Sequence, residues 1–311
     1  MKKLIIFFAA MLFALTPVKK ITYNGYISKI TFNKKYLVTG LENGNIIIKD
    51  FKTFKTKHII KLPKIHDFMG DLASMPIYSM NIAPNNKKLM ILVQGEESKR
   101  ILFIYSFEKN KLTKIFTTKQ TLMKGSFITD NKIFFALLSD EVLLYDLSKN
   151  KNIYKKQIGN YVFSTYALNK NRSLAVLGDE SGALKIINIK TGSVKEIKGF
   201  NKDKTLSCDI QNNLIINGSS DMRVAVYDIT NNTAVTSLKS KFLPYGAALS
   251  PDLSKFAFQI NEKNDIGVYS IYKKFLFSLK GHTMALNGIK FLSPEKIISF
   301  SPAEILIWKL K

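Results

Sequence analysis

The sequence predicts an all-β fold, a seven-bladed β-propeller, because one strand-rich unit recurs along the whole chain and no segment shows sustained helical periodicity. Each unit contains a short β-rich run followed by a polar turn. The first step between runs is 56 residues and the others are 39 to 42, and a period near 40 is that of a propeller blade. The seven runs end at Asp50, Ser106, Asp146, Asn188, Asp228, Ser270 and Lys309.

The fifth unit shows most clearly how strands alternate with turns. A run over 214–218 leads through Ser219-Ser220-Asp221 into a second run over 222–227, and a third run over 233–238 follows the turn at 228–232. Such Asn- and Asp-rich turns supply the positive φ of tight hairpins. The runs are nearly continuous in Ile, Leu and Val, as expected for strands buried on both faces between packed blades.

The two ends of the chain are predicted to share the last blade. The seventh unit stops after its third strand at Leu310, so its fourth strand must come from the N-terminus. The candidate is Lys20 to Tyr26, which would close the ring and remove its open edges.

Residues 1–16 are predicted to be a signal peptide, with the propeller over 17–311. Lys2 and Lys3 precede an unbroken apolar run from Leu4 to Leu15, which is shorter than the ~20 residues that a spanning helix needs. A buried first helix is the alternative. We therefore expect export to the bacterial periplasm, a monomer, and no stable membrane insertion.

The net charge of +24 does not by itself indicate a nucleic-acid partner. Of 47 basic residues only Arg100, Arg172 and Arg223 are arginines, and direct readers of bases and phosphates favour arginine's planar fork. Abundant lysine is also what an AT-rich coding bias produces. The single cysteine, Cys208, excludes an internal disulfide and is expected to be a buried, inert thiol.

Catalytic and cofactor signatures are absent from the sequence. It has no phosphate loop, G-x-S-x-G, H-E-x-x-H or C-x-x-C, and only three histidines. We therefore expect a non-catalytic protein without a cofactor or metal, which binds other proteins.

The 56-residue step holds about fifteen extra residues over 63–76, which should join the outer strand of blade one to the inner strand of blade two. Long loops on rigid scaffolds often carry function. A metal site formed by His66, Asp67 and Asp71, and a crossover packed by its own apolar residues, are the alternatives to a partner contact. The candidate partner-binding residues are His66, Asp67, Phe68, Met69, Asp71 and Met75.

Charge is expected to differ between the two faces of the disc. The turns between second and third strands should lie on the same face as the crossovers and form an acidic rim, whereas the other turns hold many lysines. Such a difference in charge between the two faces would create an electric field that orients approaching partner proteins. The acidic set is Glu42, Glu96, Glu97, Asp140, Glu141, Asp179, Glu180, Asp221, Glu262, Asp265 and Glu304.

Several of these elements resemble the WD40-repeat family. Val38-Thr39-Gly40 with Asn43-Gly44 is similar to its second and third strands, Gly281-His282 to its Gly-His element, and Trp308 to its tryptophan. The resemblance covers Ile21 to the C-terminus. It implies a protein-binding propeller, although the Asp-His-Ser-Trp network of the family is missing from most blades.

The export signal, length, degenerate blades and lysine-rich segment over 61–67 together resemble the NapL-like family of accessory proteins, which are encoded with the periplasmic nitrate reductase. This resemblance implies nitrate-reductase subunits as partners and a role in maturation or electron supply. An envelope or outer-membrane assembly scaffold is the first alternative. A propeller hydrolase or lactonase is the second, but it would need carboxylates on the inner strands, which have almost none.

Overall fold

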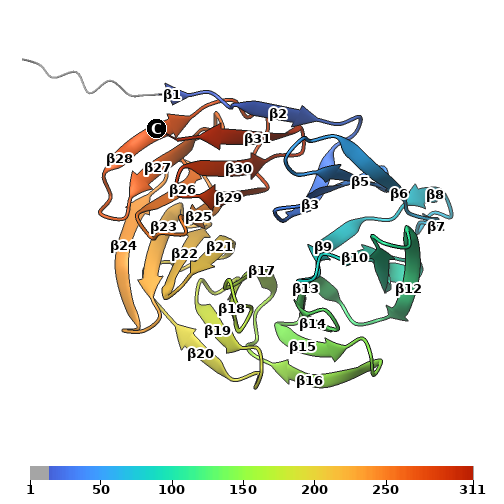
Figure 1. Ribbon diagram of the computed structural model, residues 1–311. Coiled ribbons are helices and arrows are strands. Elements are labelled where there is room, and N and C mark those ends of the chain that lie inside the picture. The colour runs from blue at the N-terminus through green and yellow to red at the C-terminus, as the bar shows by residue number, and fades with distance from the viewer. Residues whose placement is uncertain (1–13, 311) are drawn as a thin grey trace, which may run out of the picture.

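The computed structural model describes residues 14–310 and shows seven antiparallel sheets, the blades, arranged in a closed ring around a central space (Figure 1). Each blade has four strands, and one blade gains a short fifth strand. Consecutive strands of a blade are hydrogen-bonded neighbours, from the inner strand beside the axis to the outer strand at the rim. The predicted seven-bladed propeller is confirmed.

The strands of the first six blades follow one another along the chain. Blade one has β3 (Ile27–Phe32), β4 (Tyr36–Leu41), β5 (Asn45–Asp50) and β6 (Thr56–Lys61). Blade two has β9 (Ile77–Ile82), β10 (Lys88–Gln94), β11 (Arg100–Ser106) and β12 (Lys111–Thr118). Blade three has β13 (Leu122–Thr129), β14 (Lys132–Leu137), β15 (Glu141–Asp146) and β16 (Lys151–Gln157).

Blade four has β17 (Phe163–Leu168), β18 (Leu174–Asp179), β19 (Leu184–Asn188) and β20 (Val194–Ile197). Blade five has β21 (Thr205–Gln211), β22 (Leu214–Ser219), β23 (Arg223–Asp228) and β24 (Thr233–Lys239). Blade six has β25 (Ala247–Leu249), β26 (Lys255–Gln259), β27 (Ile266–Ser270) and β28 (Phe275–Leu279).

Blade seven joins the two ends of the chain. It contains β29 (Gly288–Ser293), β30 (Lys296–Phe300) and β31 (Glu304–Lys309), and its outer strand is β2 (Lys19–Thr22). The register pairs Ile21 with Ile305, and the Val18 amide donates to the carbonyl of Ile307 at 2.8 Å. The predicted closure is therefore confirmed, although the strand ends at Thr22 rather than at Tyr26.

A two-residue strand, β1 (Ala14–Leu15), precedes this closure and pairs in parallel with β28 of blade six. Residues 1–13, which hold most of the predicted signal peptide, lie outside the described residues. Cleavage after residue 16 would remove β1 and leave β2 in place, so the closure of the ring does not depend on the leader. Within residues 14–310 no helix is long and apolar enough to cross a membrane.

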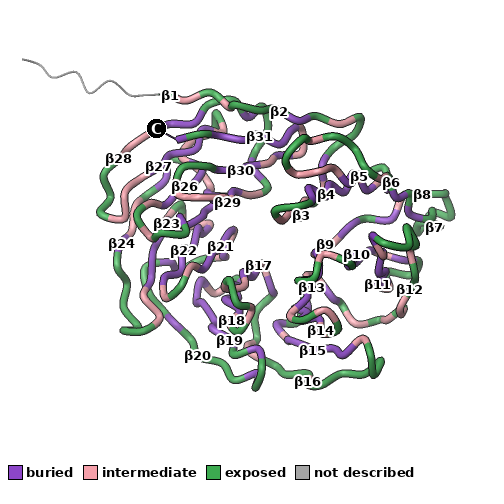
Figure 2. The backbone as a smooth tube through the Cα atoms, in the orientation of Figure 1, coloured by how far each residue is buried: buried purple, intermediate pink, exposed green. Residues whose placement is uncertain are grey.

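Apolar side chains fill the interface between each pair of neighbouring blades. Between blades one and two, for example, Val38 and Ile46 pack in one cluster with Leu89 and Ile91. The middle strands are consequently buried on both faces, whereas the outer strands and the turns are largely exposed (Figure 2). Each fully buried Ile or Leu contributes roughly 1.5–3 kcal/mol, which explains the continuous apolar runs of the sequence.

The hydrogen-bond network of the WD40 family is complete in blade seven, with a glutamate in place of the aspartate. The Trp308 indole donates to Ser299 Oγ at 2.8 Å, and His282 Nε2 lies 2.7 Å from the same hydroxyl. His282 Nδ1 lies 3.0 Å from Glu304. Burial lowers the pKa of His282, so a neutral ring donates from Nδ1 to Glu304 and accepts from Ser299.

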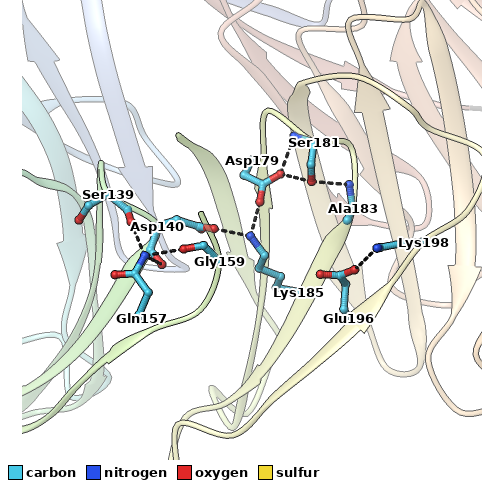
Figure 3. A network of polar contacts seen from close by, with 10 residues as sticks. All are labelled: Ser139, Asp140, Gln157, Gly159, Asp179, Ser181, Ala183, Lys185, Glu196 and Lys198. Atoms are coloured by element: carbon cyan, nitrogen blue, oxygen red, sulfur yellow. Dashed lines mark hydrogen bonds and ion pairs between the residues drawn. The ribbon is translucent and has the colours of Figure 1, made fainter. Parts of the chain in front are cut away.

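A second polar network joins blades three and four (Figure 3). Lys185, on β19, forms ion pairs with Asp179 of its own blade and with Asp140 in the β14–β15 turn of blade three. All three side chains are almost completely buried. Asp179 also accepts hydrogen bonds from the amide and hydroxyl of Ser181. Between these blades an ionic contact thus supplements the apolar interface.

Candidate functional site

The extra residues between blades one and two form a small β-hairpin. Its strands are β7 (Lys64–His66) and β8 (Leu72–Ser74), and His66 pairs with Leu72 at its closed end. The insertion does join β6 to β9 as expected, but the loop predicted for it is a hairpin. Its strands are only three residues long, too short for an alternation of apolar and polar residues to stand out in the sequence.

Asp67 shapes the turn of this hairpin. Its carboxylate Oδ1 accepts hydrogen bonds from the amides of Met69 and Asp71 at 2.9 and 3.0 Å, and its own amide donates to the carbonyl of Asp71. Gly70 takes a φ of 89°, which favours glycine. Asp67 is therefore engaged by backbone amides, as in an Asx-turn.

His66 fixes the hairpin to blade two. Its backbone amide and its Nδ1 each lie 3.1 Å from Oε1 of Glu96, in the one-turn 3-10 helix η1 (Glu96–Ser98) between β10 and β11. These hydrogen bonds from His66 lower the pKa of Glu96, so the carboxylate stays ionised. The described residues contain no group of three or more His, Cys, Asp or Glu side chains that could hold a metal ion.

The apolar residues of the hairpin and its flanks fall into two groups, one buried in the core and the other exposed to solvent. Met75 is 4% exposed and packs with Ile65 in the core between blades one and two. In contrast, Phe68 is 101% exposed, Met69 81% and Leu72 63%. Met75 therefore belongs to the core and is not available to a partner, whereas Leu72, absent from the predicted set, joins Phe68 and Met69 at the exposed tip.

The acidic rim expected on the crossover face is only partly formed, because four of its eleven residues are buried. Asp140, Asp179, Asp265 and Glu304 are buried in contacts within the fold. The crossover segments, which lie on the same face as these hairpin turns, also carry lysines. The face is consequently of mixed charge, and its exposed crossover lysines are Lys64, Lys119, Lys198, Lys202, Lys241 and Lys280.

A second candidate region, the central channel, was missed by the sequence analysis. Two adjoining hollows of about 660 and 570 Å³ are lined by residues from the inner strands of all seven blades or from their flanking turns. Asp209 is the only carboxylate among these lining residues. The cationic lining residues are Lys29, Lys124, Lys170, Arg172 and Lys290.

The signal for these lysines was present but faint. Lys29, Lys124 and Lys290 are each the third residue of an inner strand, in Ile27-Ser28-Lys29, Leu122-Met123-Lys124 and Gly288-Ile289-Lys290. Alternate residues of a strand point the same way, so a lysine at this position can face the axis. With 44 lysines in the chain, three more inside short strands did not stand out.

No family model and no curated protein matches the sequence. Among solved structures, 1810 chains match the fold. One is the β-propeller domain of Cps50 (Swd1) from Myceliophteria thermophila, with a TM-score of 0.75 and 12% sequence identity, covering 95% of this chain and 99% of that domain. At this identity the likeness shows the fold alone, a WD40-like seven-bladed propeller.

Proposed function

We propose that the protein is a non-catalytic periplasmic scaffold that binds other proteins through the tip of the β7–β8 hairpin, and that it serves periplasmic nitrate reductase in maturation or electron supply. The observation that carries the binding role is the display of Phe68 and Met69 on a turn held by Asp67 and fixed to blade two through His66. Large apolar side chains on a preorganised turn are typical anchors of protein interfaces.

The fold and the chemistry of the channel support a scaffold over an enzyme. The WD40-like propeller is compatible with protein binding, and the carboxylate of Asp209 is already paired with Lys290. A hydrolase with a metal at the axis needs several converging carboxylates, which the lining of the channel lacks. The periplasmic location and the nitrate-reductase partner rest on the resemblances of the sequence.

One observation favours the envelope-assembly scaffold as a second candidate. The exposed tip presents the apolar side chains of Phe68, Met69 and Leu72 beside the carboxylates of Asp67 and Asp71, and exposed apolar side chains would bind extended segments of outer-membrane precursors. The two candidates share the hairpin as the contact site and differ in the partner, so a single experiment can separate them.

The experiment is an affinity pull-down from the periplasm of nitrate-grown cells, with the tagged mature protein as bait. The test variant is Phe68→Ser/Met69→Ser, and the matched control is Tyr272→Ser, since Tyr272 is 90% exposed in the β27–β28 turn on the opposite face. We expect nitrate-reductase subunits with wild type and Tyr272→Ser, and their loss with the hairpin variant. Outer-membrane precursors or assembly factors in their place would support the second candidate, and equal recovery by all three baits would refute the hairpin as the contact.

A further inference from the structure

The channel carries more positive charge than its own side chains neutralise. Lys290 forms an ion pair with Asp209, whose side chain is 1% exposed. Lys29 has no hydrogen-bond or ion-pair partner among residues 14–310, and Lys124 donates to the carbonyl of Tyr166 at 2.6 Å but meets no carboxylate among them. Lys29 and Lys124 therefore have no carboxylate partner in the channel; Lys124 is partly buried there and Lys29 is accessible to solvent.

The register places these groups in two adjacent layers of the channel wall. Lys29 pairs with Gly40 and Lys124 with Ala136, at equivalent positions of blades one and three. Lys290 pairs with Ile298, one side-chain layer further along the axis. All three line the hollows described above, so the lysines converge on one space from blades one, three and seven.

Keeping the partly buried ammonium group of Lys124 charged and unpaired costs free energy. Desolvation lowers the pKa of Lys29, and it lowers the pKa of Lys124 to about 8. Replacement of Lys124 by an apolar residue would avoid this cost, and nothing in the packing requires the charge. A bound anion would remove the cost, because it neutralises the ammonium groups and satisfies their remaining N–H donors.

We propose that the central channel binds a small oxyanion of charge near −2, such as a phosphate group, between Lys29, Lys124 and Lys290. A dianion matches the two positive charges of Lys29 and Lys124, and Lys170 and Arg172 add further positive charge to the same lining. Lysine acts toward phosphate as a point charge with three donors. Asn81, in the same layer as Lys290, has an amide Nδ2 with no partner among the described residues, and its Oδ1 is used by the Phe127 amide. It can supply a further donor. This site lies apart from the hairpin and does not depend on the proposed function.

The test is calorimetric titration of the full-length mature protein with inorganic phosphate at pH 7. Wild type should bind in a saturable manner with one site. Lys124→Met and Lys29→Met should each weaken the affinity about tenfold or more, the usual size for the loss of a charged hydrogen bond. Lys114→Met is the matched control, because Lys114 is exposed on the outer strand β12 and its replacement removes the same charge as the two channel substitutions. It should change the affinity less than about twofold, since exposed charges act weakly.

The pH dependence gives a readout that general attraction to a basic protein would not. The groups facing Lys124 are Lys29, Lys290, Asp209, Cys208 and Tyr166. Binding should weaken as pH rises through about 8, where free Lys124 loses its proton, and Lys124→Met should lack this step. Glycerol phosphate in place of phosphate distinguishes a phosphomonoester from the free anion: tighter binding assigns the former, and equal or weaker binding the latter.

Two results would overturn the proposal. One is the absence of saturable phosphate binding to a wild type that is folded by circular dichroism. The other is an equal loss of affinity in Lys124→Met, Lys29→Met and Lys114→Met, which would show attraction to the net charge alone. A variant that unfolds is replaced by Lys124→Gln, which keeps a polar side chain of similar length.

Discussion

Replacement of Lys185 by methionine should destabilise the fold by leaving two buried carboxylates without their cation. Asp140 and Asp179 are both completely buried, and each pairs with Lys185 (Figure 3). Breaking a buried ion pair by removing one partner typically costs 3–5 kcal/mol. For a domain of this size, each kcal/mol lowers the melting temperature by slightly less than about 2 °C, so we expect a decrease of roughly 5–8 °C at pH 7.

The pH dependence of this loss identifies its cause. Burial already raises the pKa of Asp140, and the hydrogen bond and charge of Lys185 oppose that rise. Without Lys185 the native pKa of Asp140 should rise further above its unfolded value. A carboxyl group with a raised native pKa destabilises the fold when it is ionised, and protonation removes this destabilisation. The difference in free energy of unfolding between the variant and wild type should therefore shrink as pH falls from 7 toward 5.

The assay is urea unfolding followed by circular dichroism at pH 7 and pH 5. Lys198→Met is the matched control, since Lys198 lies just after the same blade's outer strand, is 81% exposed and pairs with Glu196. It should leave the midpoint nearly unchanged. Asp140→Asn added to Lys185→Met should recover part of the loss. A loss below about 1 kcal/mol, or one that does not vary with pH, would refute the account and point to packing alone.

Three further predictions concern the closure and packing of the ring. Although burial alone would raise the pKa of Glu304, hydrogen bonds from Thr283, Ser301 and His282 lower it to about 2. Its stabilisation is therefore present above about pH 4.5 and lost toward pH 2. The free energy of unfolding from urea titration should exceed that of Glu304→Gln by about 3 kcal/mol at pH 7, and this difference should vanish over that window. Gly159→Ala places a methyl group against Asp140 and Lys185 and should cost about 1–3 kcal/mol; an unchanged midpoint would contradict this contact. Deletion through Thr22 leaves β31 as an open edge, and gel filtration should show association or aggregation instead of a single monomer peak.

The fold was predictable from the sequence because the signals that define a blade are local and repeated. The apolar runs, their period and the Asn-Gly turn at Asn43-Gly44 each reflect burial or backbone geometry within a few residues. Ring closure followed from one missing strand at Leu310. The hairpin over 64–74 was missed because short strands carry little periodicity.

The surface and the channel were harder to predict, because they depend on which residues meet across blades. The sequence indicated that Asp140 and Asp179 are exposed turn residues, yet both are buried between blades three and four and form ion pairs with Lys185. Met75 looked like a contact residue, yet it anchors the hairpin in the core. Lys29, Lys124 and Lys290 are separated by 95 and 166 residues in sequence, and only the closed ring brings them to one space.

The pairing of β2 with β31 also constrains when the native state can form. Thr22 and Glu304 are hydrogen-bonded neighbours separated by 282 residues, and joining such distant segments of a flexible chain costs about 5 kcal/mol of loop entropy. During synthesis from the N-terminus, β2 is made well before its partner β31. Long-range pairing of this kind slows folding. Until β31 is available, β2 lacks its partner strand and the ring cannot close, and an unpaired strand edge is a site at which chains aggregate.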